Sequence, residues 1–164
     1  MPQERPWPAP APALKKIDLT IARLRLLLAE VTAREAALKE QRRTCAEQNN
    51  KLITFSLYGD SSLDSVLAML GDVQERLSHI EATVRALGAI RQRAENELES
   101  LQLTKGIEEA KVLLHELQAM QARPTDPANA LSPAQIEAEI TRLRTLINEA
   151  SERAAQNIGR AHRS

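Results

Sequence analysis

Apolar residues recur along most of the chain in alternating steps of three and four, the spacing that places side chains on one face of a coiled-coil helix. We call this series of positions the seam. From Leu63 to Leu101, eleven of the twelve seam positions are apolar, and Arg91 is the exception. Because Gly71 and Gly88 lie off the seam and its phase continues across both, the pattern predicts one long helix.

The same steps begin at Leu14 and predict a first helix that ends near Leu57. The first six seam positions, up to Val31, are apolar. Beyond Val31, alternate seam positions turn polar: Glu35, Arg42 and Asn49. Polar seam residues can fix the register of a helix pair at a cost in stability, whereas a frayed or water-facing helix gives the same pattern. The sequence leaves both interpretations open.

These two helices are joined by a short turn, so they are expected to lie antiparallel. Residues 14–57 carry nine basic and five acidic side chains, whereas residues 58–105 carry five and eight. The opposite net charges favour pairing of the two helices with each other. The predicted fold class is therefore all-α: an elongated antiparallel coiled-coil hairpin plus a C-terminal helix that folds back on it.

The seam shifts phase near Leu101. This shift favours one kinked helix that continues to about Ala122, and a turn at residues 104–106 is the alternative. The segment that follows, "RPTDPANALSP", contains three prolines and ends the helix.

The last helix carries its own start signal. Ser132 is placed as the N-cap, Pro133 as the first helical residue, and Gln135 as the partner of a capping box. Gly159 is the predicted stop. The predicted organisation is a Pro/Ala-rich tail (1–13), a long helical hairpin (14–122), a Pro-rich linker (123–131) and a C-terminal helix (132–164).

Composition restricts the class of protein. Ala, Glu, Lys, Leu and Arg make up about half of the chain, whereas aromatic residues are only 2%, so narrow aliphatic seams must form the core. Net charge is zero, which disfavours nucleic acid as a partner because such binding depends on neutralised phosphates. No apolar run approaches the ~20 residues of a membrane span. A single cysteine excludes an internal disulfide, and we expect a cytoplasmic protein.

The stretch "NNKLITFSLYGDSSLD" holds Phe55 and Tyr58, two of the three aromatic residues. Three interpretations compete: the aromatics close the end of the seam, they form an exposed recognition site, or the segment is a short strand that pairs with a partner. Gly59 is predicted to cap the first helix, and Ser61 with Asp64 to form a capping box for the second.

Chemistry-bearing motifs are absent from the sequence. It contains no Gly-rich phosphate loop, nucleophile elbow or His-Glu-x-x-His pattern. His79, His115 and His162 lie far apart, and Cys45 falls on the seam, where a thiol is ordinarily a small buried hydrophobe. We therefore predict no enzymatic activity, no metal and no cofactor.

Two segments favour binding only weakly. Residues 22–34 place arginines opposite an apolar side, as a membrane-surface helix does, but a wide stripe covered by other helices or by an oligomer explains them better. Arg42, Arg43 and Lys51 form a modest basic patch with too little charge for phosphate binding.

The predicted function is that of a non-enzymatic coiled-coil scaffold or adaptor, with a protein partner that is itself helical, or with self-association. Candidate partner-binding residues are Phe55, Leu57 and Tyr58 at the turn, together with Trp7 in the tail, for which the favoured alternative is an incidental Trp in a floppy Pro-rich segment. The alternative is a hairpin that holds client proteins, like prefoldin-type chaperones or secretion stalks. A nucleic-acid-associated coiled coil is the third possibility, and binding to a membrane is not expected.

Overall fold

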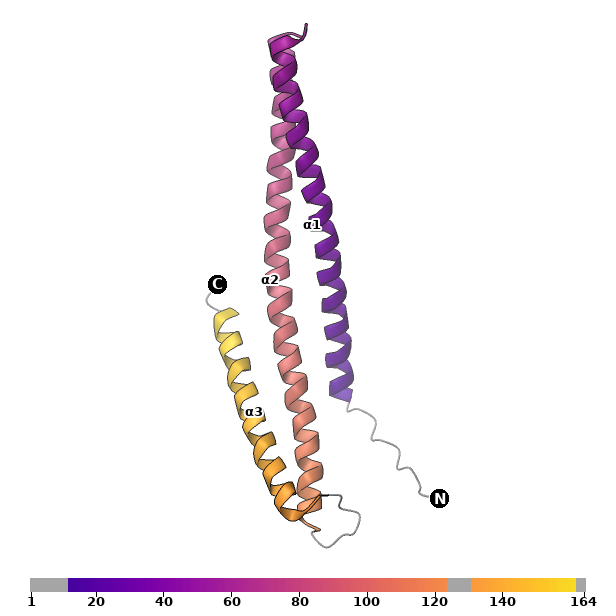
Figure 1. The fold of residues 1–164 in the computed structure, drawn as a ribbon, viewed down its shortest axis with the longest axis vertical. Coiled ribbons are helices and arrows are strands. Elements are labelled where there is room, and N and C mark those ends of the chain that lie inside the picture. The colour runs from indigo at the N-terminus through magenta and orange to yellow at the C-terminus, as the bar shows by residue number, and fades with distance from the viewer. Residues whose placement is uncertain (1–11, 124–130, 162–164) are drawn as a thin grey trace, which may run out of the picture. The chain divides into compact units, whose positions relative to one another are not determined.

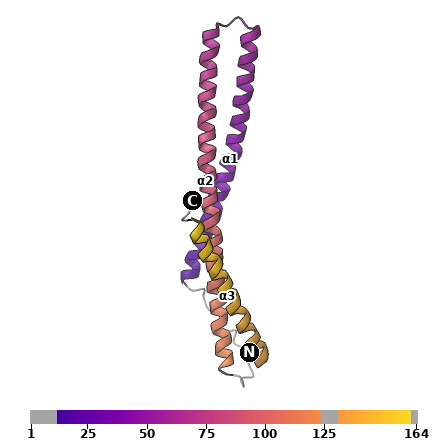
Figure 2. The ribbon, with the colours of Figure 1, turned by 90° about the vertical axis from the view of Figure 1, so that its left-hand side faces the viewer.

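A computed structural model describes residues 12–123 and 131–161 and contains three α-helices and no strand within these ranges. They are α1 (Pro12–Tyr58, 47 residues), α2 (Leu63–Gln121, 59 residues) and α3 (Pro133–Ala161, 29 residues). α1 packs antiparallel to α2, and α3 packs antiparallel to α2 (Figures 1 and 2). The all-α prediction is confirmed. The tail with Trp7 and most of the Pro-rich linker lie outside the described residues.

Contacts divide the chain into two compact units, and each contains parts of α1 and α2. Unit 1 comprises Met1–Leu24 with Asn96–Ser164, and unit 2 comprises Arg25–Glu95. Unit 2 therefore holds the turn between α1 and α2, whereas unit 1 holds α3.

One of the two alternating series of predicted seam positions in unit 2 is buried, whereas Leu63 and Val84 of the other series are exposed, at 66% and 40%. On α2 the buried side chains recur every seven residues, at Val66, Val73, Ile80, Leu87 and Ala94. On α1 they are Val31 and Cys45, and Cys45 packs in one cluster with Val73 and Ile80. Heptad spacing on both helices is the pattern of an antiparallel pair whose core is one narrow layer of mostly small aliphatic side chains.

Glu35, the first polar seam residue of α1, is not water-facing. Its carboxylate forms an ion pair with Arg91, the one polar seam residue of α2, and both side chains are about 30% exposed (29% and 31%). Arg91 also donates a 3.0 Å hydrogen bond to the Thr32 hydroxyl and lies 3.7 Å from Glu95. The hydrogen bond that Arg91 donates to the Glu35 carboxylate raises the pKa of Arg91 above its ordinary value. The seam is therefore interrupted on both helices at the same level.

The other two polar seam residues of α1 also have partners on α2. Arg42 lies 3.6 Å from Glu81, and the Gln74 amide donates a long, 3.5 Å hydrogen bond to Asn49. As the residue number rises along α1, the number of its partner on α2 falls, as antiparallel helices require. Of the two interpretations that the sequence leaves open, the structure supports polar pairing at Glu35, whereas Arg42 is 63% exposed and also faces water.

The buried side chains of unit 1 lie on α3, on α2 and, at Ile21, on α1. Ile136, Ile140 and Leu143 form the buried stripe of α3, and Ala110 is the buried residue of α2 in this unit. The ammonium group of Lys105 forms an ion pair with the carboxylate of Asp18 on α1, at 2.6 Å. Because α2 is helical throughout residues 104–106, the predicted continuation of this helix is confirmed and the turn is excluded.

The start of α3 matches its prediction closely. The Gln135 N–H donates to the Ser132 hydroxyl at 3.3 Å, and the Ser132 N–H donates to the Gln135 side chain at 2.9 Å. This reciprocal pair is the capping box. The predicted stop at Gly159 is wrong, because α3 continues to Ala161 and no described glycine has a positive φ.

The turn between α1 and α2 differs from its prediction in two details. The N-cap of α2 is Ser62 rather than Ser61, since the Ser62 hydroxyl accepts a 3.3 Å hydrogen bond from the N–H of Ser65. Gly59 does follow the last residue of α1, but its φ is not positive, so it is not a left-handed cap. Its N–H instead donates to the Phe55 carbonyl at 2.7 Å and completes the last turn.

Candidate functional site

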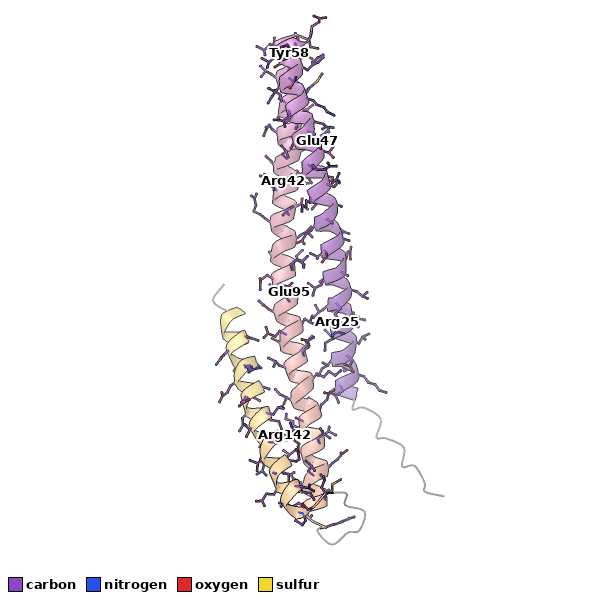
Figure 3. All side chains as sticks on the ribbon, viewed as in Figure 1. Arg25, Arg42, Glu47, Tyr58, Glu95 and Arg142 are labelled. Carbon is purple, nitrogen blue, oxygen red and sulfur yellow. The ribbon has the colours of Figure 1, made fainter. Side chains whose placement is uncertain are left out.

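Large apolar side chains are exposed around the turn that joins α1 to α2, where Tyr58 lies (Figure 3). Tyr58 is 87% exposed, Leu57 70% and Phe55 51%. Among the 22 residues from Asn49 to Leu70 only three are charged, a smaller share than the 27% of the whole chain. Exposed apolar side chains in a charge-poor segment are typical of a protein-binding surface. We call the following set the turn surface: Ile53, Phe55, Leu57, Tyr58, Leu63, Leu67 and Met69.

The exposure of Phe55 and Tyr58 and the helical conformation of this segment exclude two of its three sequence interpretations, and the third, recognition of a partner, stays a prediction. Neither aromatic closes the seam, and α1 is helical as far as Tyr58, so the seam-plug and strand interpretations are both wrong. The covered seam side chains near the turn are instead Leu52, which packs against the cluster of Cys45, Val73 and Ile80, and Val66, which is 1% exposed. The sequence contained this signal, because the three-four series passes through Leu52 and Ser56 and omits both aromatics.

One side of the helix pair is hollowed next to the turn. Two adjoining grooves of about 850 and 340 Å³ share Gln48, Asp72 and Arg76 in their walls. The smaller groove is also lined by Lys51 and Met69. We call this side the groove face.

Phe55 and Tyr58 extend the groove face to the end of α1. They follow Lys51 by four and seven residues, so all three side chains share one stripe of the helix. Phe55 therefore lies on the same side of the pair as Met69, and the two bring exposed apolar surface to the mouth of the smaller groove.

The opposite side of the pair carries aliphatic residues near the turn. The Asn49–Gln74 hydrogen bond marks this side, because neither residue lines a groove. Ile53 follows Asn49 by four residues, and Leu67 precedes Gln74 by seven, so both lie on it. Leu57 and Leu63, each one helical turn further toward the turn between the helices, complete what we call the aliphatic face. Sequence reasoning used Ile53 only in the strand interpretation, assigned no role to Leu67 or Met69, and placed Leu63 on the seam, although Leu63 is 66% exposed.

Two of the three residues of the predicted basic patch (Arg42, Arg43 and Lys51) are neutralised by carboxylates. Arg42 pairs with Glu81, and Arg43 contacts both Glu40 and Glu47. The hydrogen bond from Arg43 holds the pKa of the Glu40 carboxyl below its ordinary value. These guanidinium groups are satisfied within the chain, which leaves little positive charge to attract phosphate.

The larger groove brings together Cys45 and His79, the two residues whose chemistry could serve catalysis. Cys45 is buried in the floor of the groove, and His79 is exposed on its wall. Among residues 12–123 and 131–161, no three metal-ligating side chains come together and no buried side-chain nitrogen or oxygen lacks a partner. In those same ranges, no helix has the length and apolarity that crossing a membrane requires.

Comparisons with known proteins add no assignment: the chain matches no protein-family model, no curated protein and no solved structure.

Replacing Gly59 by alanine is expected to disturb the turn. A Cβ atom at this position would lie 2.6 Å from the Phe55 carbonyl oxygen and 3.0 Å from a carbon of the Phe55 ring. The backbone must therefore shift, at a cost of about 1–3 kcal/mol in the free energy of unfolding. Urea denaturation followed by circular dichroism measures this change.

Gly71→Ala is the matched control for Gly59→Ala. A Cβ atom at position 71 meets nothing within 4 Å, and the residue lies inside α2. This variant is expected to gain roughly 0.5–1 kcal/mol, because alanine is the better helix former. Equal effects at the two glycines would show that the described geometry of the turn is wrong.

Proposed function

We propose that this chain is a non-enzymatic helical scaffold or adaptor in the cytoplasm, whose groove face binds a helical segment of another protein. The observation that carries the proposal is the exposure of Phe55 and Tyr58, at 51% and 87%, in a chain with only three aromatic residues. Aromatic side chains are the commonest anchors of protein interfaces. Their position beside an open groove supports binding at this place.

The groove suits a helix of about three turns. The two adjoining grooves together extend along α1 from Glu40 to Leu52, a distance of roughly 18 Å at 1.5 Å per residue, and their floor includes Cys45, Leu52 and Ile80. A third helix laid between two antiparallel helices buries its own apolar stripe against such a floor. Phe55 and Met69 then contact one end of the bound helix.

Site-specific photocrosslinking in cells tests the proposal. A photoreactive phenylalanine analogue at Tyr58 is expected to give one or a few adducts of defined mass, whereas the same analogue at Lys39 gives none. Lys39 is an exposed residue of α1 that lines neither groove and lies away from the turn. Absence of adducts at Tyr58, or the same adducts at both positions, would remove the groove face as a docking site.

A client-holding function is the second candidate, because unit 2 exposes aliphatic residues away from the turn as well. Leu26 is 72% exposed and Ile90 46%. If the chain holds unfolded clients, it suppresses the aggregation of unrelated proteins, and its adducts at Tyr58 form a broad smear. Discrete adducts without suppression of aggregation favour the adaptor.

A further inference from the structure

The aliphatic face of the turn surface lies apart from the groove face that the proposed function uses. Its four members expose 45% (Ile53), 70% (Leu57), 66% (Leu63) and 55% (Leu67) of their surface. All four are branched aliphatic residues, the type that fills the cores of helical bundles. An adaptor that binds through the groove face leaves this set uncovered.

The arrangement of these four side chains is self-complementary. Ile53 and Leu57 are four residues apart on α1, and Leu63 and Leu67 are four apart on α2. Each pair therefore forms one short row along its helix. Because α1 and α2 are antiparallel and joined at the turn, the two rows lie next to each other with the same chemistry and spacing. A two-fold axis parallel to the helices brings the α1 row of one copy onto the α2 row of the other, and does so twice.

The charges near the aliphatic face also bear on whether two copies can approach each other through it. The next residues along this face, away from the turn, are Asn50 and Gly71, and then the hydrogen-bonded pair Asn49 and Gln74. None of these is charged, so this part of the face brings no like charges together, and the acidic residues Asp60 and Asp64 lie at its turn end. Gly71 is exposed, and a Cβ atom there would meet nothing within 4 Å. A glycine in this place lets a second helix approach the backbone closely.

We propose that a second copy of this chain docks on the aliphatic face, so that the turn ends of two α1–α2 pairs form a short four-helix bundle. In that bundle Leu57 of each copy packs between Leu63 and Leu67 of the other. Ridges of residues spaced by four then interdigitate, as they do between packed helices in general. The proposal concerns a surface that the groove-face partner does not use, and it stands or falls separately from the adaptor function.

The area of the face predicts a weak dimer. The four side chains together expose the equivalent of between two and three whole residues, or on the order of 400 Å² per copy. A stable interface buries about 800 Å² per partner. The association is therefore expected to depend visibly on concentration, with monomer at low and dimer at high concentration.

Sedimentation equilibrium of the full chain, from micromolar to near-millimolar concentration, tests the inference. For the wild type, the weight-average mass is expected to rise from that of one chain toward that of two. Leu57→Asp buries a carboxylate in the bundle and is expected to weaken the association about tenfold or more. Leu26→Asp is the matched control, because Leu26 is a leucine of the same helix with nearly the same exposure, 72%, and it should leave the association unchanged.

A charge-pairing experiment tests which residues meet. Leu57→Lys and Leu67→Glu each weaken self-association, whereas an equimolar mixture of the two associates more tightly than either alone, because Lys at position 57 of one copy faces Glu at position 67 of the other. Circular dichroism establishes that the variants keep their helix content. The inference is overturned if the wild type keeps the mass of one chain at every concentration. It is also overturned if Leu57→Asp associates like the wild type, or if Leu26→Asp weakens association as much as Leu57→Asp does.

Discussion

Ile80→Ala is expected to lower the free energy of unfolding by about 2–4 kcal/mol, the usual cost of deleting a buried isoleucine to alanine. Ile80 is only 6% exposed and packs with Cys45 and Val73 in the buried cluster of unit 2, with Leu77 against it. The core between α1 and α2 is a single layer of side chains, so no second layer can move in to fill the cavity that Ile80→Ala leaves. Urea denaturation followed by far-ultraviolet circular dichroism measures the loss.

Ile90→Ala is the control within the same helix. Ile90 is 46% exposed, and the higher helix propensity of alanine, worth up to about 0.7 kcal/mol, offsets part of the lost contact. The change in unfolding free energy is expected to stay below about 1 kcal/mol. If both isoleucines cost the same, the seam is not where the structure places it.

Heptad spacing predicted the fold well because burial in a helix pair follows directly from periodicity. From the sequence alone, the series through Val66, Val73, Ile80 and Leu87 identified the buried face of α2, and the structure buries all four. The capping box at Ser132 was equally predictable from the sequence, since its hydrogen bonds join residues only three apart.

Features that depend on backbone geometry at the ends of helices were harder to predict from the sequence. Ser61 and Ser62 are both competent N-caps, and only the path of the turn selects Ser62. Gly59 is fixed by its close approach to the Phe55 carbonyl rather than by a positive φ. Gly159 does not stop α3, because a glycine inside a helix costs only about 1 kcal/mol.

The partners of the polar seam residues could not be predicted without the register. Net charge favoured basic α1 residues against acidic α2 residues, and the Arg42–Glu81 pair follows that order. Glu35 with Arg91 reverses it. Pairing between the helices is thus decided by which residues reach the same level, a property of register rather than of net charge.

The same register produces the candidate site. When Glu35 meets Arg91 and Asn49 meets Gln74, Leu52 packs against the cluster of Cys45, Val73 and Ile80, and the next seam position of α1 is Ser56 rather than Phe55. The aromatic residues of the turn surface then have no seam position to fill and remain exposed. A different register would change the residues that the turn presents, and both proposed binding faces with them.

Reversing the charge of Glu35 or of Arg91 is expected to have the second large effect on stability, and reversing both together tests whether the two residues meet. Glu35→Arg places two guanidinium groups together in a half-buried seam position, and Arg91→Glu places the carboxylate beside both Glu35 and Glu95. Each reversal is expected to lower the midpoint of thermal unfolding by several degrees, since like charges repel and the lost hydrogen bonds are not replaced. Reversing both residues restores an ion pair across the helices, and with it most of the stability.

Thermal unfolding of these four proteins, followed by circular dichroism, is the most direct test of the antiparallel register on which both binding faces depend. The structure predicts that Glu35→Arg/Arg91→Glu unfolds at a higher temperature than either single variant and recovers more than half of the loss. If the double variant is as unstable as the sum of the two single variants, Glu35 and Arg91 do not meet, and the pairing of α1 with α2 described above is wrong.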